Sequence, residues 1–211
     1  MKGNGMQEIM SVAKEFGLDS LVDVGMDLMP YVSNFRNMVK FNRLERRMKE
    51  HSDQLKVIGQ LSKSSSLAPD YITERIFPIV LADLIEEHED AKISLLLNGF
   101  ENVFINENKN ESIVINYYDT LRNLRYEDIM RFYYLMGIND TYNNPHILSE
   151  EAAFILSIDK KLERYELVRR IHRKTAQNGE PIMVEPTYVE NTAFGLRFLS
   201  FISLNEEKVA E

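Results

Sequence analysis

The chain has no cysteine among its 211 residues. This absence excludes disulfide frameworks, cysteine-ligated zinc and thiol nucleophiles, and it is the usage expected of a reducing compartment. No window approaches the roughly 18 consecutive apolar residues of a membrane span. Residues 1–16 carry Lys2, Glu8, Lys14 and Glu15, and they lack the apolar core of a signal peptide. These features together predict a cytoplasmic protein.

Catalytic signatures are also missing. There is no Gly-x-Ser-x-Gly elbow and no Gly-x-x-x-x-Gly-Lys loop, and the close glycine pair Gly3 and Gly5 precedes no strand. The four histidines stand in no recognisable catalytic setting: His51, His88, His146 and His172. We therefore expect no catalytic residue, no metal, no cofactor and no small-molecule substrate.

The net charge of −8 argues against a protein that coats nucleic acid with its whole surface. The distribution of charge is uneven, however. Basic residues gather in segments 36–56 and 160–174, whereas acidic residues crowd 83–90 and the last residues of the chain. A contact between basic and acidic segments, within or between subunits, is as natural an outcome as binding a polyanion.

Apolar periodicity indicates a mainly α fold, and a chain of this length can bury roughly 70% of its unfolded surface. Residues 18–29 have a helix pattern that Pro30 ends, with three aspartates opposite the apolar side, which disfavours insertion into a membrane surface. Residues 31–61 predict one long amphipathic helix. Its wet face carries five candidate contact residues: Arg36, Lys40, Arg43, Arg46 and Arg47.

The Ser-rich run 62–69 is the predicted linker. Beyond it, 70–105 is expected to be helical, with His88 and Ala91 in its buried stripe. Residues 112–124 and 126–136 predict two further helices, although 113–115 would also suit a strand, and Gly137 closes the second. Residues 148–174 predict a helix that opens at Ser149.

The acidic run Glu86–Asp90 combines carboxylates with an imidazole. A helical metal site would place ligands three or four residues apart on one face, but the residue three before His88 is Ile85. A solvated acidic face is therefore the favoured interpretation.

The basic run near the C-terminus is the strongest functional signal. Over 159–174, seven cations outnumber the acids Asp159, Glu163 and Glu166, and such cations could meet phosphates and base edges on DNA. A solvated helix end is the competing explanation, since the macrodipole favours cations in a last turn. The candidate contact residues are Lys160, Lys161, Arg164, Arg169, Arg170, Arg173 and Lys174.

A hairpin is expected after the basic run. The dipeptide Asn178-Gly179 signals a turn, and the segments 182–185 and 188–189 predict two short strands. Thr192 then caps a closing helix, in which Gly195 allows close packing. The apolar side of that helix carries Phe194, Phe198, Phe201 and Ile202. The order of helix, hairpin and helix resembles a winged-helix module, with a plain helical hairpin and an irregular loop as the alternative.

Several soft motifs extend the resemblance over most of the chain. They are a basic amphipathic region at 18–56, Glu-His-Glu-Asp-Ala-Lys-Ile at 87–93, Tyr-Tyr-Asp-x-Leu-x-x-Leu at 117–124, Glu-Asp-Ile at 127–129 and Thr-x-Phe-Gly at 192–195. Together they resemble uncharacterised bacterial and prophage proteins of the abortive-infection type. This resemblance implies a phage-defence or phage-encoded accessory role, and it transfers no functional residue.

The sequence thus predicts an N-terminal amphipathic helical segment (1–61), a linker (62–69), a central helical region (70–124) and a winged-helix-like module (125–211). The expected function is that of a non-enzymatic interaction or regulatory protein that binds a protein partner or itself. A winged-helix DNA-binding regulator is the alternative.

Overall fold

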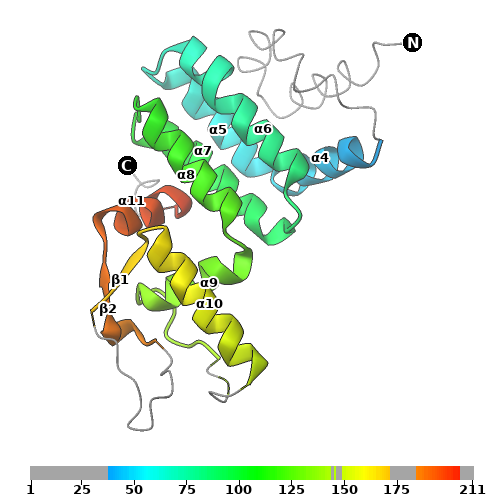
Figure 1. The fold of residues 1–211 in the computed structure, drawn as a ribbon. Coiled ribbons are helices and arrows are strands. Elements are labelled where there is room, and N and C mark those ends of the chain that lie inside the picture. The colour runs from blue at the N-terminus through cyan, green and yellow to red at the C-terminus, as the bar shows by residue number, and fades with distance from the viewer. Residues whose placement is uncertain (1–37, 144, 146–148, 172–183, 205–211) are drawn as a thin grey trace. The chain divides into compact units, whose positions relative to one another are not determined.

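The computed structural model describes residues 38–143, 145, 149–171 and 184–204 (Figure 1). These residues are mainly helical and contain one small antiparallel sheet of two strands, so the predicted mainly α class is confirmed. They form two compact units. Unit 1 comprises 38–122 and 201–204, and unit 2 comprises the described part of 123–200, so unit 2 is an insertion within unit 1.

The predicted long helix over 31–61 is two helices, α4 (Met38–Glu50) and α5 (Ser52–Ser64). The break is at His51, whose φ of −109° and ψ of 24° leave the helical region. Its backbone N–H still donates to the carbonyl of Arg47, and its carbonyl accepts from Leu55, so hydrogen bonding continues across the bend. The helical spacing of apolar residues also continues across the bend, so the sequence pattern does not distinguish two helices from one. Residues 31–37 lie outside the described residues.

The segment 70–105 is likewise not one helix. A π-helical turn (η2, Tyr71–Ile76) leads into α6 (Phe77–Glu86), and a 3₁₀ turn (η3, Asp90–Lys92) leads into α7 (Ile93–Ile105). Between them the Glu87 carboxylate accepts hydrogen bonds from the backbone N–H groups of His88 and Glu89, which stops α6. His88 and Ala91 are consequently exposed, and their predicted place in the buried stripe is wrong.

The Ser-rich run is shorter and more ordered than a linker. Helix α5 includes Ser64, and Leu67 is buried. Ser65 and Ser66 donate hydrogen bonds to the Glu107 carboxylate. The helices on both sides of this run belong to unit 1.

The core of unit 1 forms where α5 and α6 pack against α7 and α4 packs against α6. Helix α8 (Glu111–Asn123) follows, as predicted, with the Tyr118 hydroxyl donating to the carbonyl of Leu96. The end of α11 (Ala193–Ile202) completes the unit. The Phe201 ring lies so close to Gly99 that a Cβ there would be 2.6 Å from it, so any larger residue at 99 would force the ring to shift.

Unit 2 contains α9 (Tyr126–Leu135), α10 (Glu150–Arg164), β1 (Val168–Arg170), β2 (Val189–Asn191) and the start of α11. Ser149 caps α10 as predicted, accepting a hydrogen bond from the backbone of Ala152 at 3.1 Å. The predicted helix over 148–174 is too long, however. Glu166 adopts a φ of +57°, which ends the helix, and Arg169 and Arg170 lie in a strand.

The hairpin also differs from the prediction. Strand β1 pairs with β2 in the register Val168 to Asn191 and Arg170 to Val189, so the first strand comes from the basic run and not from 182–185. Val184 and Glu185 lie outside any strand, whereas 178–179 and 182–183 are outside the described residues. A short 3₁₀ turn (η4, Pro186–Tyr188) precedes β2.

The predicted start of the closing helix is confirmed. Thr192 Oγ1 accepts a hydrogen bond from the backbone N–H of Gly195 at 2.8 Å and donates to the carbonyl of Glu166. A Cβ at position 195 would lie 1.9 Å from the carbonyl oxygen of Leu167, so the helix can approach β1 only with glycine there.

Candidate functional site

The predicted basic face of α4 is turned toward the acidic end of α6. Lys40 forms an ion pair with Glu86, and Arg43 Nη1 donates to the carbonyl of Ile85 at 3.4 Å. Arg46 pairs with Glu50 at 3.0 Å and with Asp90 at 2.8 Å. These cations therefore have partners within unit 1. Arg36, the remaining member of the predicted set, lies outside the described residues.

Arg47 is buried, and its predicted place on the wet face of the helix is wrong. Its side chain is 1% exposed, and it donates to the carbonyls of Leu84 and Glu87 at 2.7 Å and to Asp90 Oδ1 at 2.7 and 2.9 Å. The pKa of Asp90 is lowered, and the hydrogen bond from Arg47 is the largest cause of this shift. A contact between a basic and an acidic segment, one of the two outcomes that the sequence left open, is thus found within unit 1.

The rest of the acidic run is also used internally. Buried Lys92 pairs with Glu87 at 2.6 Å, and half-exposed Arg122 pairs with Asp83 at 2.8 Å. Burial raises the pKa of Asp83, although Arg122 opposes that shift. Among the described residues no cluster of three or more histidine or acidic side chains could hold a metal ion.

The basic candidates of unit 2 divide into paired and exposed side chains. Lys161 pairs with Asp128 at 2.6 Å, and Arg170 lies 3.6 Å from Glu163. Three others are exposed and extend from α10 and β1: Lys160, Arg164 and Arg169. Arg173 and Lys174 lie outside the described residues. The run is therefore not one continuous recognition face on a single helix.

A buried arginine in unit 2 escaped the sequence analysis. Arg131 Nε and Nη2 donate to the two oxygens of Asp159 at 2.8 and 3.1 Å, and Nη2 also donates to the carbonyl of Val184 at 2.6 Å. The rings of Tyr134 and Tyr142 lie 5.2 and 4.8 Å from the guanidinium carbon. Only the position of Arg131 within an otherwise apolar helix pattern could have signalled this centre.

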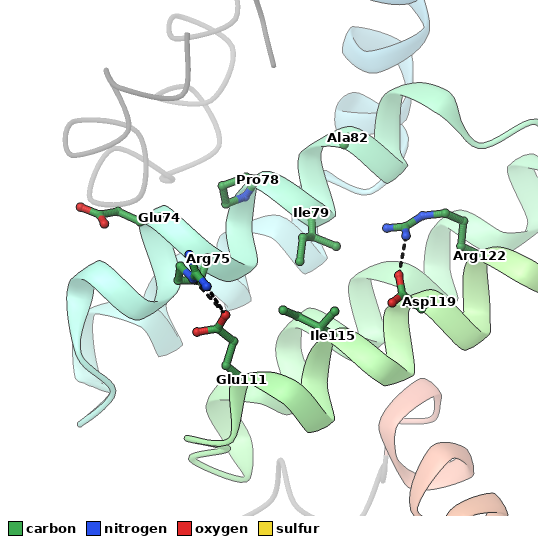
Figure 2. Close-up of a pocket in the computed structure, with 9 residues that line it drawn as sticks. All are labelled: Glu74, Arg75, Pro78, Ile79, Ala82, Glu111, Ile115, Asp119 and Arg122. Atoms are coloured by element: carbon green, nitrogen blue, oxygen red, sulfur yellow. Dashed lines mark hydrogen bonds and ion pairs between the residues drawn. The ribbon is translucent and has the colours of Figure 1, made fainter. Parts of the chain in front are cut away.

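A groove of about 400 Å³ lies between α6 and α8 in unit 1, and it is called the α6–α8 groove from here on. Figure 2 shows Ile79 and Ile115 facing one another across it. Pro78 and Ala82 extend the apolar lining along α6. Ile79 and Ile115 are both half-buried, and their exposed parts form a surface suited to an apolar partner. Its charged lining residues are Glu74, Arg75, Glu111, Asp119 and Arg122.

Ion pairs border the groove at both ends (Figure 2). At one end, Arg75 Nε and Nη2 donate to Glu111 Oε1 at 2.9 and 2.6 Å. At the other end, Arg122 Nη1 donates to Asp119 at 2.7 Å, while its other nitrogens hold Asp83. Both arginines of the lining are therefore paired with acids, and Ile79 and Ile115 lie between these ion pairs.

One wall of the groove begins in the π-helical turn η2, which contributes Glu74 and Arg75. Pro78 has no N–H to donate to the turn before it, and the wider π-helical turn is one way to accommodate that loss. Such turns are rare and occur frequently at functional sites. The proline was visible in the sequence, but its effect on the preceding turn was not.

The chain matches no protein-family model, no curated protein and no solved structure. None of the helices within the described ranges is both long and apolar enough to cross a bilayer.

Proposed function

We propose that this chain is a non-enzymatic interaction protein whose α6–α8 groove binds an apolar helix of a partner protein. The observation that supports this proposal is the pair Ile79 and Ile115, which face each other across a groove whose bordering arginines, Arg75 and Arg122, are held in ion pairs. A groove of this kind gains binding free energy by burying the apolar stripe of an amphipathic helix, and its ion pairs fix the register.

A phage-defence or prophage-related role is part of the proposal. Its support is the resemblance of the motifs at 87–93, 117–124 and 192–195 to abortive-infection proteins. The motif at 87–93 lies in unit 1, and residues 117–123 of the second motif belong to α8, the helix that lines the groove. The partner is then a protein of the infected bacterium or of its virus.

The test compares three full-length proteins as baits in lysates of infected and uninfected bacteria. Ile79→Asp/Ile115→Asp places two charges in the groove, whereas Ile113→Asp places one on exposed surface of the same helix, outside the lining. Quantitative mass spectrometry should find a protein that wild type and Ile113→Asp retain and that the groove variant loses by at least about tenfold. Equal retention by all three folded proteins would contradict the proposal.

The alternative is a DNA-binding regulator with unit 2 as a winged-helix module. The observation in its favour is the exposure of Lys160, Arg164 and Arg169 on consecutive elements of that unit. Each phosphate that they neutralise should contribute roughly −0.9 to the log-log slope of affinity against salt. A gel shift at low salt that is sequence-selective and lost on replacing all three by Gln would support this alternative.

A further inference from the structure

We infer that a second pocket in unit 1 binds a free α-amino acid with an apolar side chain. The pocket lies beside the end of α5 and has a volume of about 250 Å³. Pockets for drug-sized ligands range from roughly 300 to 1,000 Å³, so this one suits a small metabolite. It shares no described lining residue with the α6–α8 groove, and the inference therefore does not depend on the proposed function.

One part of the lining is apolar and buried. It consists of Leu67, Ile72 and Phe104. These residues come from three segments, namely the Ser-rich run, η2 and α7, so tertiary packing holds the surface in place. An apolar side chain that covers this surface gains binding free energy because both are removed from water.

Two hydroxyl groups of the lining can accept hydrogen bonds from a ligand but cannot donate. Ser65 Oγ donates to Glu107 Oε1 at 3.0 Å and accepts from the backbone N–H of Leu67, and buried Thr73 Oγ1 donates to the carbonyl of Pro69 at 3.0 Å. A hydroxyl carries one hydrogen, so only oxygen lone pairs remain for a ligand. Helix α5 also ends here, and the C-terminal end of a helix carries a partial negative charge. This side of the pocket therefore suits a ligand ammonium group.

Lys63 supplies the opposite charge. It is the only charged residue in the described lining, it is exposed, and it forms no ion pair with another described residue. A lysine ammonium group can only donate, and a carboxylate accepts the strongest hydrogen bonds from it. An α-amino acid carries an ammonium and a carboxylate group on one carbon. It therefore meets both polar requirements while its side chain covers the apolar lining, whereas a simple amine or carboxylate meets only one.

Isothermal titration of the full-length protein with L-leucine tests the class of ligand. Three further compounds each lack one feature: isocaproate has no ammonium group, L-leucinamide has no carboxylate and glycine has no side chain. L-leucine should bind at least about tenfold more tightly than any of the three, because each change removes a charge-assisted hydrogen bond or the apolar contact. Failure of L-leucine to bind at millimolar concentration, or equal binding of L-leucine and isocaproate, would overturn the inference.

Lys63→Gln locates the site. This variant should bind L-leucine at least about tenfold more weakly and L-leucinamide as tightly as wild type does, because only the carboxylate loses its partner. Lys56→Gln is the matched control, since Lys56 is an exposed lysine of the same helix that pairs with Asp53 at 3.0 Å and lies outside the described lining. The control should bind L-leucine with wild-type affinity. Equal weakening by the two variants, or by neither, would contradict the inference.

The groove variant separates this inference from the proposed function. Ile79→Asp/Ile115→Asp should keep wild-type affinity for L-leucine, because the two sites have different linings. If that affinity is lost, the amino acid binds in the groove and this inference is wrong. If L-leucine binding depends on Lys63 but partner capture does not depend on the groove, the proposed function fails and this inference stands.

Discussion

Among the described residues, unit 1 buries Arg47 and unit 2 buries Arg131, and the two arginines are bound in different ways. In unit 1, Arg47 is 1% exposed, but its carboxylate partner Asp90 is 54% exposed. In unit 2, Arg131 and Asp159 are 0% and 1% exposed, so both charges have been removed from water. Arg47 donates to two backbone carbonyls and to the exposed carboxylate of Asp90, whereas Arg131 contacts a buried carboxylate, one carbonyl and two tyrosine rings.

This difference shows that the burial of the carboxylate partner decides how much stability is lost when an arginine is removed. Arg47 joins a helix to a loop whose carboxylate is still hydrated, so loss of the arginine leaves Asp90 solvated. Loss of Arg131 would leave Asp159 in the interior with no cation to compensate its charge. Unit 2 should therefore depend more on its arginine than unit 1 does.

The largest effect is expected for Arg131→Met. Removing one partner of a buried ion pair typically costs about 3–5 kcal/mol of unfolding free energy. Hydrogen exchange by mass spectrometry should show lost protection in peptides of α9 and α10. Arg131→Met/Asp159→Leu is the matched control, and it should recover most of the loss because no buried charge is left unpaired. A double variant as unstable as the single one would contradict this account.

A smaller loss is expected for Arg47→Met, which leaves the carbonyls of Leu84 and Glu87 without their donor. Unsatisfied buried acceptors cost about 1–3 kcal/mol each, and water can reach part of this site beside Asp90. Denaturant unfolding of the full chain measures the loss, with exchange in α4 and α6 as the local readout. Arg46→Gln, next in sequence but exposed, should leave unfolding unchanged. If Arg47→Met proved as costly as Arg131→Met, the comparison would fail.

The pKa values of Asp90 and Asp159 should lie on opposite sides of the usual value for an aspartate. The hydrogen bond from Arg47 lowers the pKa of Asp90, whereas burial raises the pKa of Asp159 in spite of Arg131. Carboxyl carbon shifts followed by NMR across the acid range should order them in this way. The reverse order would show that the burial of Asp159 is relieved in solution.

Asp90 and Asp159 should therefore change the free energy of unfolding in opposite directions as pH rises. Asp90 contributes stability above its unfolded pKa, and this contribution is lost as pH falls through the lower folded pKa. For Asp159 the folded state binds the proton more readily, so its contribution decreases as pH rises from the unfolded pKa through the folded one. Substituting each aspartate by Asn and repeating the unfolding at several pH values measures both signs.

The smallest effect is expected for the exposed cations of unit 2. Replacing Lys160, Arg164 and Arg169 by Gln together should change the unfolding free energy by no more than about 0.5 kcal/mol. Lys161→Gln is the contrasting variant, because it removes the cation beside the buried carboxylate of Asp128 and should cost about 1–3 kcal/mol. Thermal unfolding of both proteins distinguishes exposed from paired charges within one basic run.

Sequence patterns predicted what depends on neighbours along the chain. The caps at Ser149 and Thr192, the close packing at Gly195 and the helices over 112–124 and 126–136 agree with the structure, because hydrogen bonds and steric contacts over a few residues specify them. The charge distribution left two outcomes equally open, a contact between basic and acidic segments or binding of a polyanion, and the structure shows the first for α4 and the end of α6. The burial of Arg47 within this contact could not be predicted from the charge pattern.

The features that were missed depend on contacts far along the chain or on unusual backbone conformations. Glu166 ends α10 with a positive φ where glycine would be the usual signal. Arg131 finds Asp159 and Val184 on other elements. The α6–α8 groove requires two helices separated by all of α7. No local pattern contains this information.

The closure of unit 1 by α11 has a consequence for synthesis on the ribosome. The Asn98 side chain donates to the carbonyl of Ile202, 104 residues later in the chain, and the Phe201 ring fills the space beside Gly99. Chains emerge from their N-terminus and fold as units become available. The nascent protein must therefore carry an open notch beside Gly99 during translation of the whole inserted unit, and the first-translated unit is the last one to be completed.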